Sequence, residues 1–127
     1  MDTESQRGGG YVVGVDGGGT KTVCVVLDPR KTIIGQGRAG CGNRNSVGDE
    51  AARANLTRAI GDALTAAGLQ HREIGAVCAG IAGADRPLER AIVTGWFNEL
   101  FPGTPTLIYN DALIALASGT GGEQYGV

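Results

Sequence analysis

Apolar residues recur along the chain in two patterns, as short continuous runs and at spacings of three or four positions. Short apolar runs rich in β-branched residues predict strands at residues 11–15, 23–27, 74–81 and 106–109. Residues 32–38 offer a further strand, which is weaker because glycines interrupt the run. Between the strands, apolar residues three or four positions apart predict two helices, one ending near Ala67 and one over residues 88–100.

The ends of the helices carry local signals. Ser46, three residues before Asp49, resembles a capping box and predicts the start of the first helix. Gly68 predicts its end. Pro87 suits the first turn of the second helix, because the N–H that proline lacks would have no partner there. Residues 112–117 begin a predicted third helix.

The order of these elements predicts an α/β fold. Three strands joined by short turns form an antiparallel meander, and helix, strand, helix, strand and helix follow. This is the ribonuclease H-like arrangement, with a five-strand mixed sheet in the order 3-2-1-4-5 and flanking helices. In such open sheets, ligands collect beyond the carboxyl ends of the parallel strands. Asp16, residues 80–85 and Asp111 all fall at that edge, so the sequence predicts a site there.

Composition narrows the class of protein. A chain of 127 residues, of which 42% are hydrophobic, suits one domain with a modest core. The net charge of −2 argues against nucleic acid or an anionic membrane as the main partner. No apolar run approaches the roughly 20 residues of a membrane helix and no secretory signal is present, so we expect a cytoplasmic protein. Residues 1–10 are polar and then glycine-rich, which predicts a disordered leader, native or added, before a folded domain at residues 11–127.

The cysteines are not arranged as a metal site. Cys24, Cys41 and Cys78 are odd in number and lack C-x-x-C spacing. Two of them lie within apolar runs. We therefore expect buried thiols in a reducing compartment.

The stretch from Gly14 to Thr22 joins the first two strands and carries the most chemistry. Its glycines allow backbone N–H groups to close around an anion that any Cβ would keep away. A neighbouring carboxylate, a hydroxyl and an ammonium complete what a magnesium-bound polyphosphate requires. The predicted nucleotide-binding residues are Asp16, Gly17, Gly18, Gly19, Thr20 and Lys21, with Asp16 facing the metal or its waters.

Two better-known phosphate motifs do not match this stretch. The Walker pattern requires Gly-Lys after four residues, but Thr20 separates Gly19 from Lys21. The dinucleotide fingerprint requires a helix after the glycines, whereas residues 23–27 are β-branched and too few for one. A flexible hairpin turn without a ligand is the alternative, although the flanking Asp and Thr-Lys-Thr disfavour it.

Asp16-Gly-Gly-Gly-Thr-Lys-Thr22 between two strands resembles the first phosphate motif of the sugar kinase, heat-shock protein and actin superfamily of ATPases. The triple glycine before Thr-Lys-Thr is most similar to the BadF/BadG/BcrA/BcrD-type ATPase domain, which includes N-acetylglucosamine kinases. The likeness covers nearly the whole chain from Tyr11. It implies an actin-like ATPase domain that uses ATP and Mg²⁺.

Asp111 follows the last predicted strand and has two interpretations. Asp is a favoured helix N-cap, which would explain its position. A carboxylate at a strand tip that faces the phosphate loop could instead accept the proton of an attacking hydroxyl. The segment from Asn110 resembles the Asn-Asp-Ala segment of sugar kinases in this superfamily. By that resemblance, Asp111 is the catalytic base and Asn110 a sugar contact.

Two further residues are candidate sugar contacts. Asn43 lies in a glycine-rich loop, where an Asn also suits a left-handed turn position. In N-acetylglucosamine kinases an Asn in the corresponding loop contacts the sugar, and Asn43 fits that place better than Asn45. Asp85 ends the small-residue loop after the fourth strand and could bind a sugar hydroxyl, although capping of the second helix explains it almost as well.

The resemblance also implies a missing part. Superfamily members close a nucleotide between two similarly folded domains, so we expect this chain to be the N-terminal half and to be inactive alone. The leading hypothesis is an ATP-dependent kinase for N-acetylglucosamine or glucosamine. The alternatives are an ATPase activator of an acyl-CoA reductase or dehydratase, and a sugar-sensing module without catalysis. The sequence leaves the choice of sugar and the oligomeric state open, with a homodimer among the alternatives.

Overall fold

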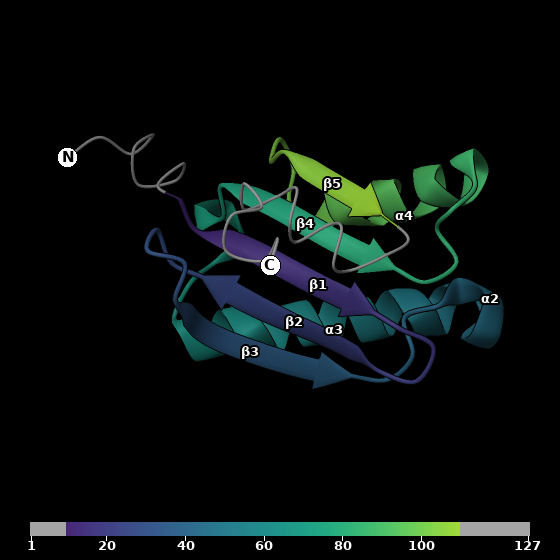
Figure 1. Cartoon of the computed structure of the whole chain (residues 1–127), viewed down its shortest axis with the longest axis horizontal. Coiled ribbons are helices and arrows are strands. Elements are labelled where there is room, and N and C mark those ends of the chain that lie inside the picture. The colour runs from purple at the N-terminus through teal and green to yellow at the C-terminus, as the bar shows by residue number, and fades with distance from the viewer. Residues whose placement is uncertain (1–9, 110–127) are drawn as a thin grey trace, which may run out of the picture.

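The computed structural model describes residues 10–109 (Figure 1). Its elements are β1 (Val12–Gly17), β2 (Thr22–Leu27), β3 (Ile33–Ala39), α2 (Arg44–Val47), α3 (Asp49–Ala67), a 3₁₀ turn (His71–Glu73), β4 (Ala76–Ile81), α4 (Pro87–Leu100) and β5 (Thr106–Tyr109). The predicted leader at residues 1–10, apart from Gly10, and the predicted helix at residues 112–117 lie outside the described residues. Within residues 10–109, no helix has the length and apolar character needed to cross a bilayer.

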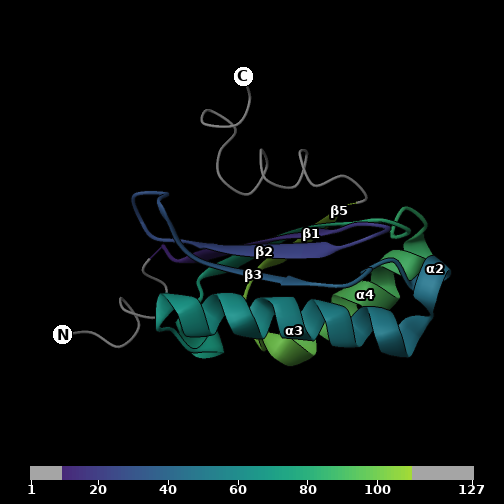
Figure 2. The same cartoon turned by 90° about the horizontal axis from the view of Figure 1, so that it is seen from below.

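The five strands form one mixed sheet in the order β3-β2-β1-β4-β5, which confirms the predicted order. β1 pairs antiparallel with β2, and β2 with β3, so these strands form the expected meander. β4 and β5 run parallel to β1. Figure 2 shows α3 and α4 on the same face of the sheet, with α3 below the meander strands. The carboxyl ends of β1, β4 and β5 therefore meet at one edge.

The core lies between the sheet and these two helices. Strand positions that alternate toward the helices are fully buried, because successive side chains of a strand point to opposite faces. The strand residues of this core are Val13, Val15, Cys24, Val26, Val77, Ala79, Ile81 and Ile108. Leu56 and Ile60 of α3 and Val93 and Phe97 of α4 pack against them. Trp96 packs against this core and stays partly exposed.

Glycines in β3 let α3 lie directly on the sheet. A Cβ added to Gly37 would lie 2.1 Å from the carbonyl oxygen of Ala59. One added to Gly35 would lie 2.3 Å from the carbonyl oxygen of Ala63. Both distances are far below van der Waals contact with backbone atoms that cannot rotate away. The glycines that weaken β3 as a strand are thus required for its contact with α3.

The observed helix ends correct one prediction and confirm two. Ser46 does not cap the long helix, because it lies inside the short helix α2 and Gly48 is the N-cap of α3. Gly48 has a φ of 89°, a conformation that glycine adopts without steric cost. Gly68 is the C-cap of α3 in the left-handed region. Pro87 is the first residue of α4.

The three cysteines are free and buried, as the sequence predicts. Burial raises the pKa of the Cys24 thiol to about 12 from its ordinary 9.0. Burial also raises the pKa of Cys78. Only the thiolate is a good nucleophile, so we expect the Cys24 and Cys78 thiols to react slowly in the folded protein.

Labelling with a disulfide reagent at pH 8 checks this expectation. At that pH the raised pKa leaves Cys24 with about a thousandfold less thiolate than an ordinary thiol. We expect Cys24 and Cys78 to react at least about a hundredfold more slowly in the native protein than in denaturant. A Ser46→Cys variant, which places a thiol at an exposed position, is the matched control and should react at once. Rapid native labelling of both buried cysteines would contradict the prediction.

Candidate functional site

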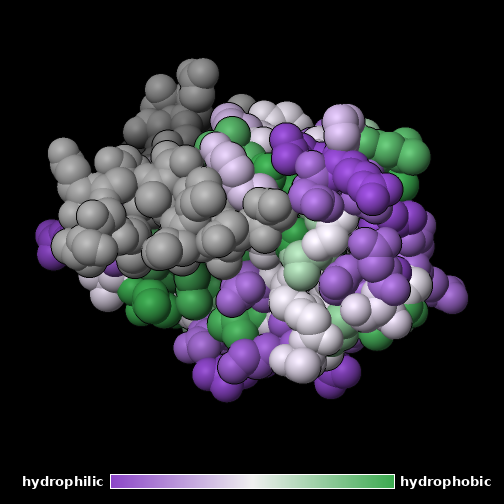
Figure 3. Space-filling view, turned by 45° about the vertical axis from the view of Figure 1, so that its right-hand side comes forward, coloured by the Kyte–Doolittle hydropathy of each residue, from purple (hydrophilic) through white to green (hydrophobic). Residues whose placement is uncertain are grey.

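The strand register brings several predicted residues to the carboxyl edge of the sheet. Asp16 of β1 pairs with Gly80 of β4, and Gly80 pairs with Tyr109 of β5. The loop that carries Asp85 leaves the sheet after β4 at this edge. Asn110 and Asp111 follow Tyr109 directly and lie outside the described residues. Figure 3 turns this side toward the viewer and shows strongly hydrophilic surface beside near-neutral surface.

The β1–β2 hairpin offers backbone donors to a ligand. The N–H of Gly18 donates to the carbonyl of Lys21 over 2.9 Å and closes the hairpin, so this amide is already used. The N–H groups of Gly19 and Thr20 donate to no other described residue. Gly19, Thr20 and Lys21 are also exposed. Two amides, a hydroxyl and an ammonium therefore remain available at the turn for an anion.

Gly17 and Gly19 of the triplet have different surroundings, so a side chain would have different effects at the two positions. A Cβ on Gly17 would lie 2.9 Å from Cδ1 of Ile81, so close packing requires this glycine. A Cβ on Gly19 would meet no described atom within 4 Å, and its φ is not positive. Neither packing nor conformation in the described part of the chain explains Gly19. A residue without a Cβ leaves space for a ligand to approach the backbone at this position, so the binding role of Gly19 stays a prediction.

Both neighbouring loops hold the hairpin through its carbonyl groups. The carbonyl of Gly18 accepts the N–H of Gly42, in the loop after β3, over 3.0 Å. The carbonyl of Gly17 accepts the N–H of Ala82, in the loop after β4, over 2.8 Å. The phosphate-loop candidate is thereby fixed relative to both loops that carry candidate sugar contacts.

Thr22, the last residue of the Gly-rich motif, has a structural role. Its side chain is fully buried, and its hydroxyl donates to the carbonyl of Gly40 over 2.8 Å. A Cβ on Gly42 would lie 2.7 Å from the Thr22 Oγ1. Thr22 thus anchors the loop after β3 beneath the hairpin and is not exposed to a ligand.

Asp16 is the carboxylate nearest in sequence to the hairpin. It is exposed on the face of the sheet opposite α3 and α4, and it has no ion pair with another described residue. Residues 10–109 contain no group of three or more His, Cys, Asp or Glu able to hold a metal. A lone carboxylate fits Mg²⁺, which usually takes one or two protein carboxylates and completes its shell with phosphate oxygens and water.

Asn43 lies at the start of α2 and does not adopt the left-handed turn conformation. Its φ is −92°, and its side-chain oxygen accepts the N–H of Asn45 over 2.9 Å as an N-cap. The Cα of Gly83 packs against this side chain, because a Cβ there would lie 2.5 Å from Asn43 Oδ1. Asn43 is thereby brought beside the loop that carries Asp85. The sequence signal for this contact is the glycine at position 83, whose φ is 88°.

Asp85 is exposed and does not cap α4. The N-cap residue is Arg86, and no side chain makes the cap hydrogen bond. The guanidinium of Arg90 donates to the backbone carbonyls of Ala84 and Asp85, each over 3.4 Å. The alternative interpretation of Asp85 as a cap is therefore wrong, and its carboxylate stays available.

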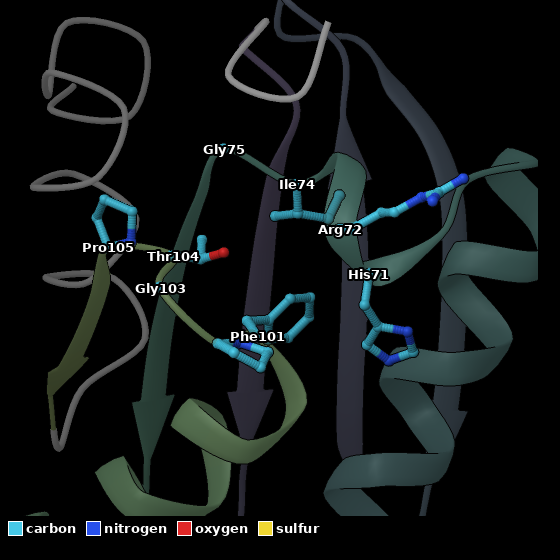
Figure 4. A pocket seen from close by; sticks show the side chains of 9 residues that line it. His71, Arg72, Ile74, Gly75, Phe101, Gly103, Thr104 and Pro105 are labelled. Carbon is cyan, nitrogen blue, oxygen red and sulfur yellow. The ribbon is translucent and has the colours of Figure 1, made fainter. Parts of the chain in front are cut away.

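A cavity of about 530 Å³ lies at the opposite edge of the sheet, before β4 and β5 begin (Figure 4). The rings of His71 and Phe101 are 5.1 Å apart at its wall. Burial lowers the pKa of His71, so this imidazole is mostly neutral near pH 7. In Figure 4 the side chain of Arg72 extends away from Phe101. None of the predicted site residues lines this cavity.

The family assignment follows from comparison with known proteins. The model of the BadF/BadG/BcrA/BcrD ATPase family matches residues 13–127. The chain belongs to this family. The match confirms the resemblance that the Gly-Gly-Gly-Thr-Lys-Thr stretch indicates, and it covers every predicted site residue.

Curated relatives of this ATPase-family chain are sugar kinases. It is 33% identical to an N-acetyl-D-glucosamine kinase of Dictyostelium discoideum over 123 residues, which are 91% of this chain and 39% of the relative. It is 34% identical over 109 residues to an N-acetylmuramic acid/N-acetylglucosamine kinase of Clostridium acetobutylicum, covering 86% of this chain and 36% of the relative. The chain thus spans about two fifths of the length of these relatives.

Solved structures confirm the fold of this family member. A candidate N-acetylglucosamine kinase from Chromobacterium violaceum superposes with a TM-score of 0.63 at 23% identity, over 89% of this chain and 39% of that one. Component A of the (R)-2-hydroxyglutaryl-CoA dehydratase of Acidaminococcus fermentans superposes with a TM-score of 0.52 at 19% identity, over 77% of this chain and 30% of that one. At these identities the likeness is one of fold.

Proposed function

We propose that the full-length protein carrying this chain transfers a phosphoryl group from ATP to a hydroxyl of an amino sugar, N-acetylglucosamine or glucosamine. One observation carries the proposal: the hairpin with free amides at Gly19 and Thr20 is hydrogen-bonded to the loop of Asn43 and to the loop of Asp85. The candidate phosphate-binding hairpin and the two candidate sugar-binding loops are therefore hydrogen-bonded together at the carboxyl edge of the sheet. The names of the two curated kinase relatives support the choice of sugar.

The residues of this edge take complementary roles in the proposed reaction. The Gly19 and Thr20 amides and the Lys21 ammonium hold the phosphates and offset their charge. Asp16 holds the metal or its water, and Mg²⁺ supplies further charge neutralisation when it is bound with ATP. Asp111 accepts the proton of the attacking sugar hydroxyl. Asn43, Asp85 and Asn110 orient the sugar, which makes the attack effectively intramolecular.

A second domain is part of the proposal. This chain spans 39% of the Dictyostelium discoideum kinase, and the superfamily that it resembles closes a nucleotide between two domains. We place residues 11–127 in the N-terminal domain and assign the adenosine pocket to the remainder of the protein. The isolated N-terminal domain then binds ATP weakly and turns over little.

The alternative of a dehydratase activator has less support. That role requires cysteines that bridge an iron–sulfur cluster between subunits. Cys24, Cys41 and Cys78 are at most 8% exposed. A buried thiol cannot reach across a subunit interface, so these three residues do not fit that role. The likeness to component A therefore supports the shared fold and not a shared activity.

A coupled kinase screen on the full-length protein tests the proposal. The protein is incubated with ATP and Mg²⁺ and with N-acetylglucosamine, glucosamine, N-acetylmuramic acid or glucose, and ADP release is compared with sugar phosphate formed. We expect stoichiometric transfer to an amino sugar. ADP release without a sugar phosphate, or no turnover with any sugar, would contradict a kinase function. Iron content of the purified protein would then test the activator alternative.

A further inference from the structure

Two side-chain amides meet at one glycine beside the phosphate hairpin. A Cβ on Gly83 would lie 2.5 Å from Oδ1 of Asn43 and 2.9 Å from Nδ2 of Asn45. Both side chains thus rest on the bare Cα of Gly83, which is held at a φ of 88°. The loop after β4 and the short helix α2 come together at this point. Because Ala82 also donates to the carbonyl of Gly17, the pair of amides is held close to the hairpin.

The two asparagines differ in what they can still bind. The oxygen of Asn43 is occupied, since it accepts the N–H of Asn45 over 2.9 Å. The side chain of Asn45 is exposed and has no partner among residues 10–109. Its carboxamide therefore offers a donor and an acceptor to a ligand, whereas Asn43 offers mainly its NH₂ group.

The backbone of Asn45 is held in place before any ligand arrives. Asn43 caps the helix through the backbone N–H of Asn45, and the Asn45 side chain lies beside the bare Cα of Gly83. The ion pair between Arg44 and Asp49, with 2.7 Å between Nε and Oδ1, ties α2 to α3. A polar group held in this way loses little conformational freedom on binding, so its hydrogen bonds contribute more to selectivity.

We propose that Asn45 selects the acceptor sugar, by donating a hydrogen bond from its carboxamide NH₂ to the acetamido carbonyl of an N-acetylated sugar. The acetamido group is a trans amide whose N–H and carbonyl point to opposite sides, so one carboxamide pairs with only one of them, and the carbonyl is the complement of the NH₂ of Asn45. A protonated amine offers no acceptor, and a hydroxyl oxygen is a weaker acceptor than an amide carbonyl. This inference rests on the proposed kinase function and names the substituent that the site recognises.

Kinetics of the full-length protein carrying Asn45→Ala or Asn45→Asp test the inference. Asn45→Asp keeps the shape and the acceptor but loses the donor. We expect Asn45→Ala to raise KM for N-acetylglucosamine about tenfold, with kcat and the KM for ATP changed less than about twofold, because one hydrogen bond is lost. The KM for glucosamine should change less, so the preference for the acetylated sugar falls. Asn98→Ala, an exposed asparagine on α4, is the matched control and should leave every constant unchanged.

The outcomes separate the inference from the function on which it rests. If the wild type phosphorylates amino sugars and Asn45→Ala leaves every sugar KM unchanged, the inference is overturned and the kinase function stands. An equal loss with all sugars, together with a lower melting temperature, would also overturn it, because Asn45 would then only support α2. If the wild type phosphorylates no sugar, the proposed function fails first.

Discussion

Asp111→Asn in the full-length protein is expected to abolish sugar phosphorylation while ATP binding persists. The amide keeps the shape of the carboxylate but cannot accept the proton of the attacking hydroxyl. Loss of a general base lowers turnover by about 10² to 10⁴. The decrease should lie in kcat, because the interaction matters most in the transition state. Coupled kinase assays give kcat, and calorimetry gives the affinity for ATP with Mg²⁺.

A control separates this effect from general damage to the protein. Asp62→Asn changes an exposed carboxylate on α3, away from the carboxyl edge, and should leave kcat unchanged. Wild-type turnover of Asp111→Asn would remove the assignment of the base. A variant that no longer binds ATP would also count against it, since the carboxylate would then serve the nucleotide site.

Gly37→Ala is expected to give the largest loss of stability in this domain. The new methyl group would lie 2.1 Å from the carbonyl oxygen of Ala59 and 2.7 Å from the backbone nitrogen of Ala63. Neither atom can move without shifting α3 away from the sheet, because both belong to the helix backbone. Overpacking of this kind costs about 3 kcal/mol or more where the backbone must move. We expect a free energy of unfolding lower by at least that amount, or failure to fold.

Gly61→Ala is the matched control for this substitution. Gly61 lies on α3, the helix that packs against Gly37, and a Cβ there would meet no described atom within 4 Å. Alanine in a helix interior stabilises by about 0.5–1 kcal/mol relative to glycine. Thermal unfolding followed by circular dichroism should therefore shift in opposite directions for the two variants. A midpoint for Gly37→Ala equal to that of the wild type would show that α3 does not lie directly on β3.

Much of the fold could be predicted because its signals are local. The run Thr106–Tyr109 is apolar and β-branched, and it forms β5 with the expected bounds. The C-cap at Gly68 follows from the ease with which glycine adopts a left-handed conformation. The start of α3 could not be predicted in this way. Ser46 carries the side-chain pattern of a cap, but α2 ends and α3 begins at Gly48, where backbone conformation and not a side chain sets the boundary.

The candidate site could also be predicted only in part. Strand topology alone brings Asp16 and Asp85 to one edge, so their placement could be inferred from the order of the elements. The backbone hydrogen bonds between loops could not be inferred from the sequence, because the N–H groups of Gly42 and Ala82 carry no side-chain signal. The same holds for the use of the Gly18 amide inside the hairpin, which leaves fewer free donors than the triplet suggests. The contact of Asn45 with Gly83 also depends on loops far apart in sequence.

The two hydrogen bonds to the carbonyls of Gly17 and Gly18 have a thermodynamic consequence for nucleotide binding. A glycine triplet that was free to move would lose much backbone entropy on gripping a polyphosphate, since glycine has more conformations to give up than any other residue. Here the neighbouring loops already restrict it, so little ordering remains when a nucleotide arrives. The enthalpy of nucleotide binding should then depend on the contacts between the nucleotide and the protein. If the isolated domain binds a nucleotide with a small enthalpy, the missing contacts are those made by the rest of the protein.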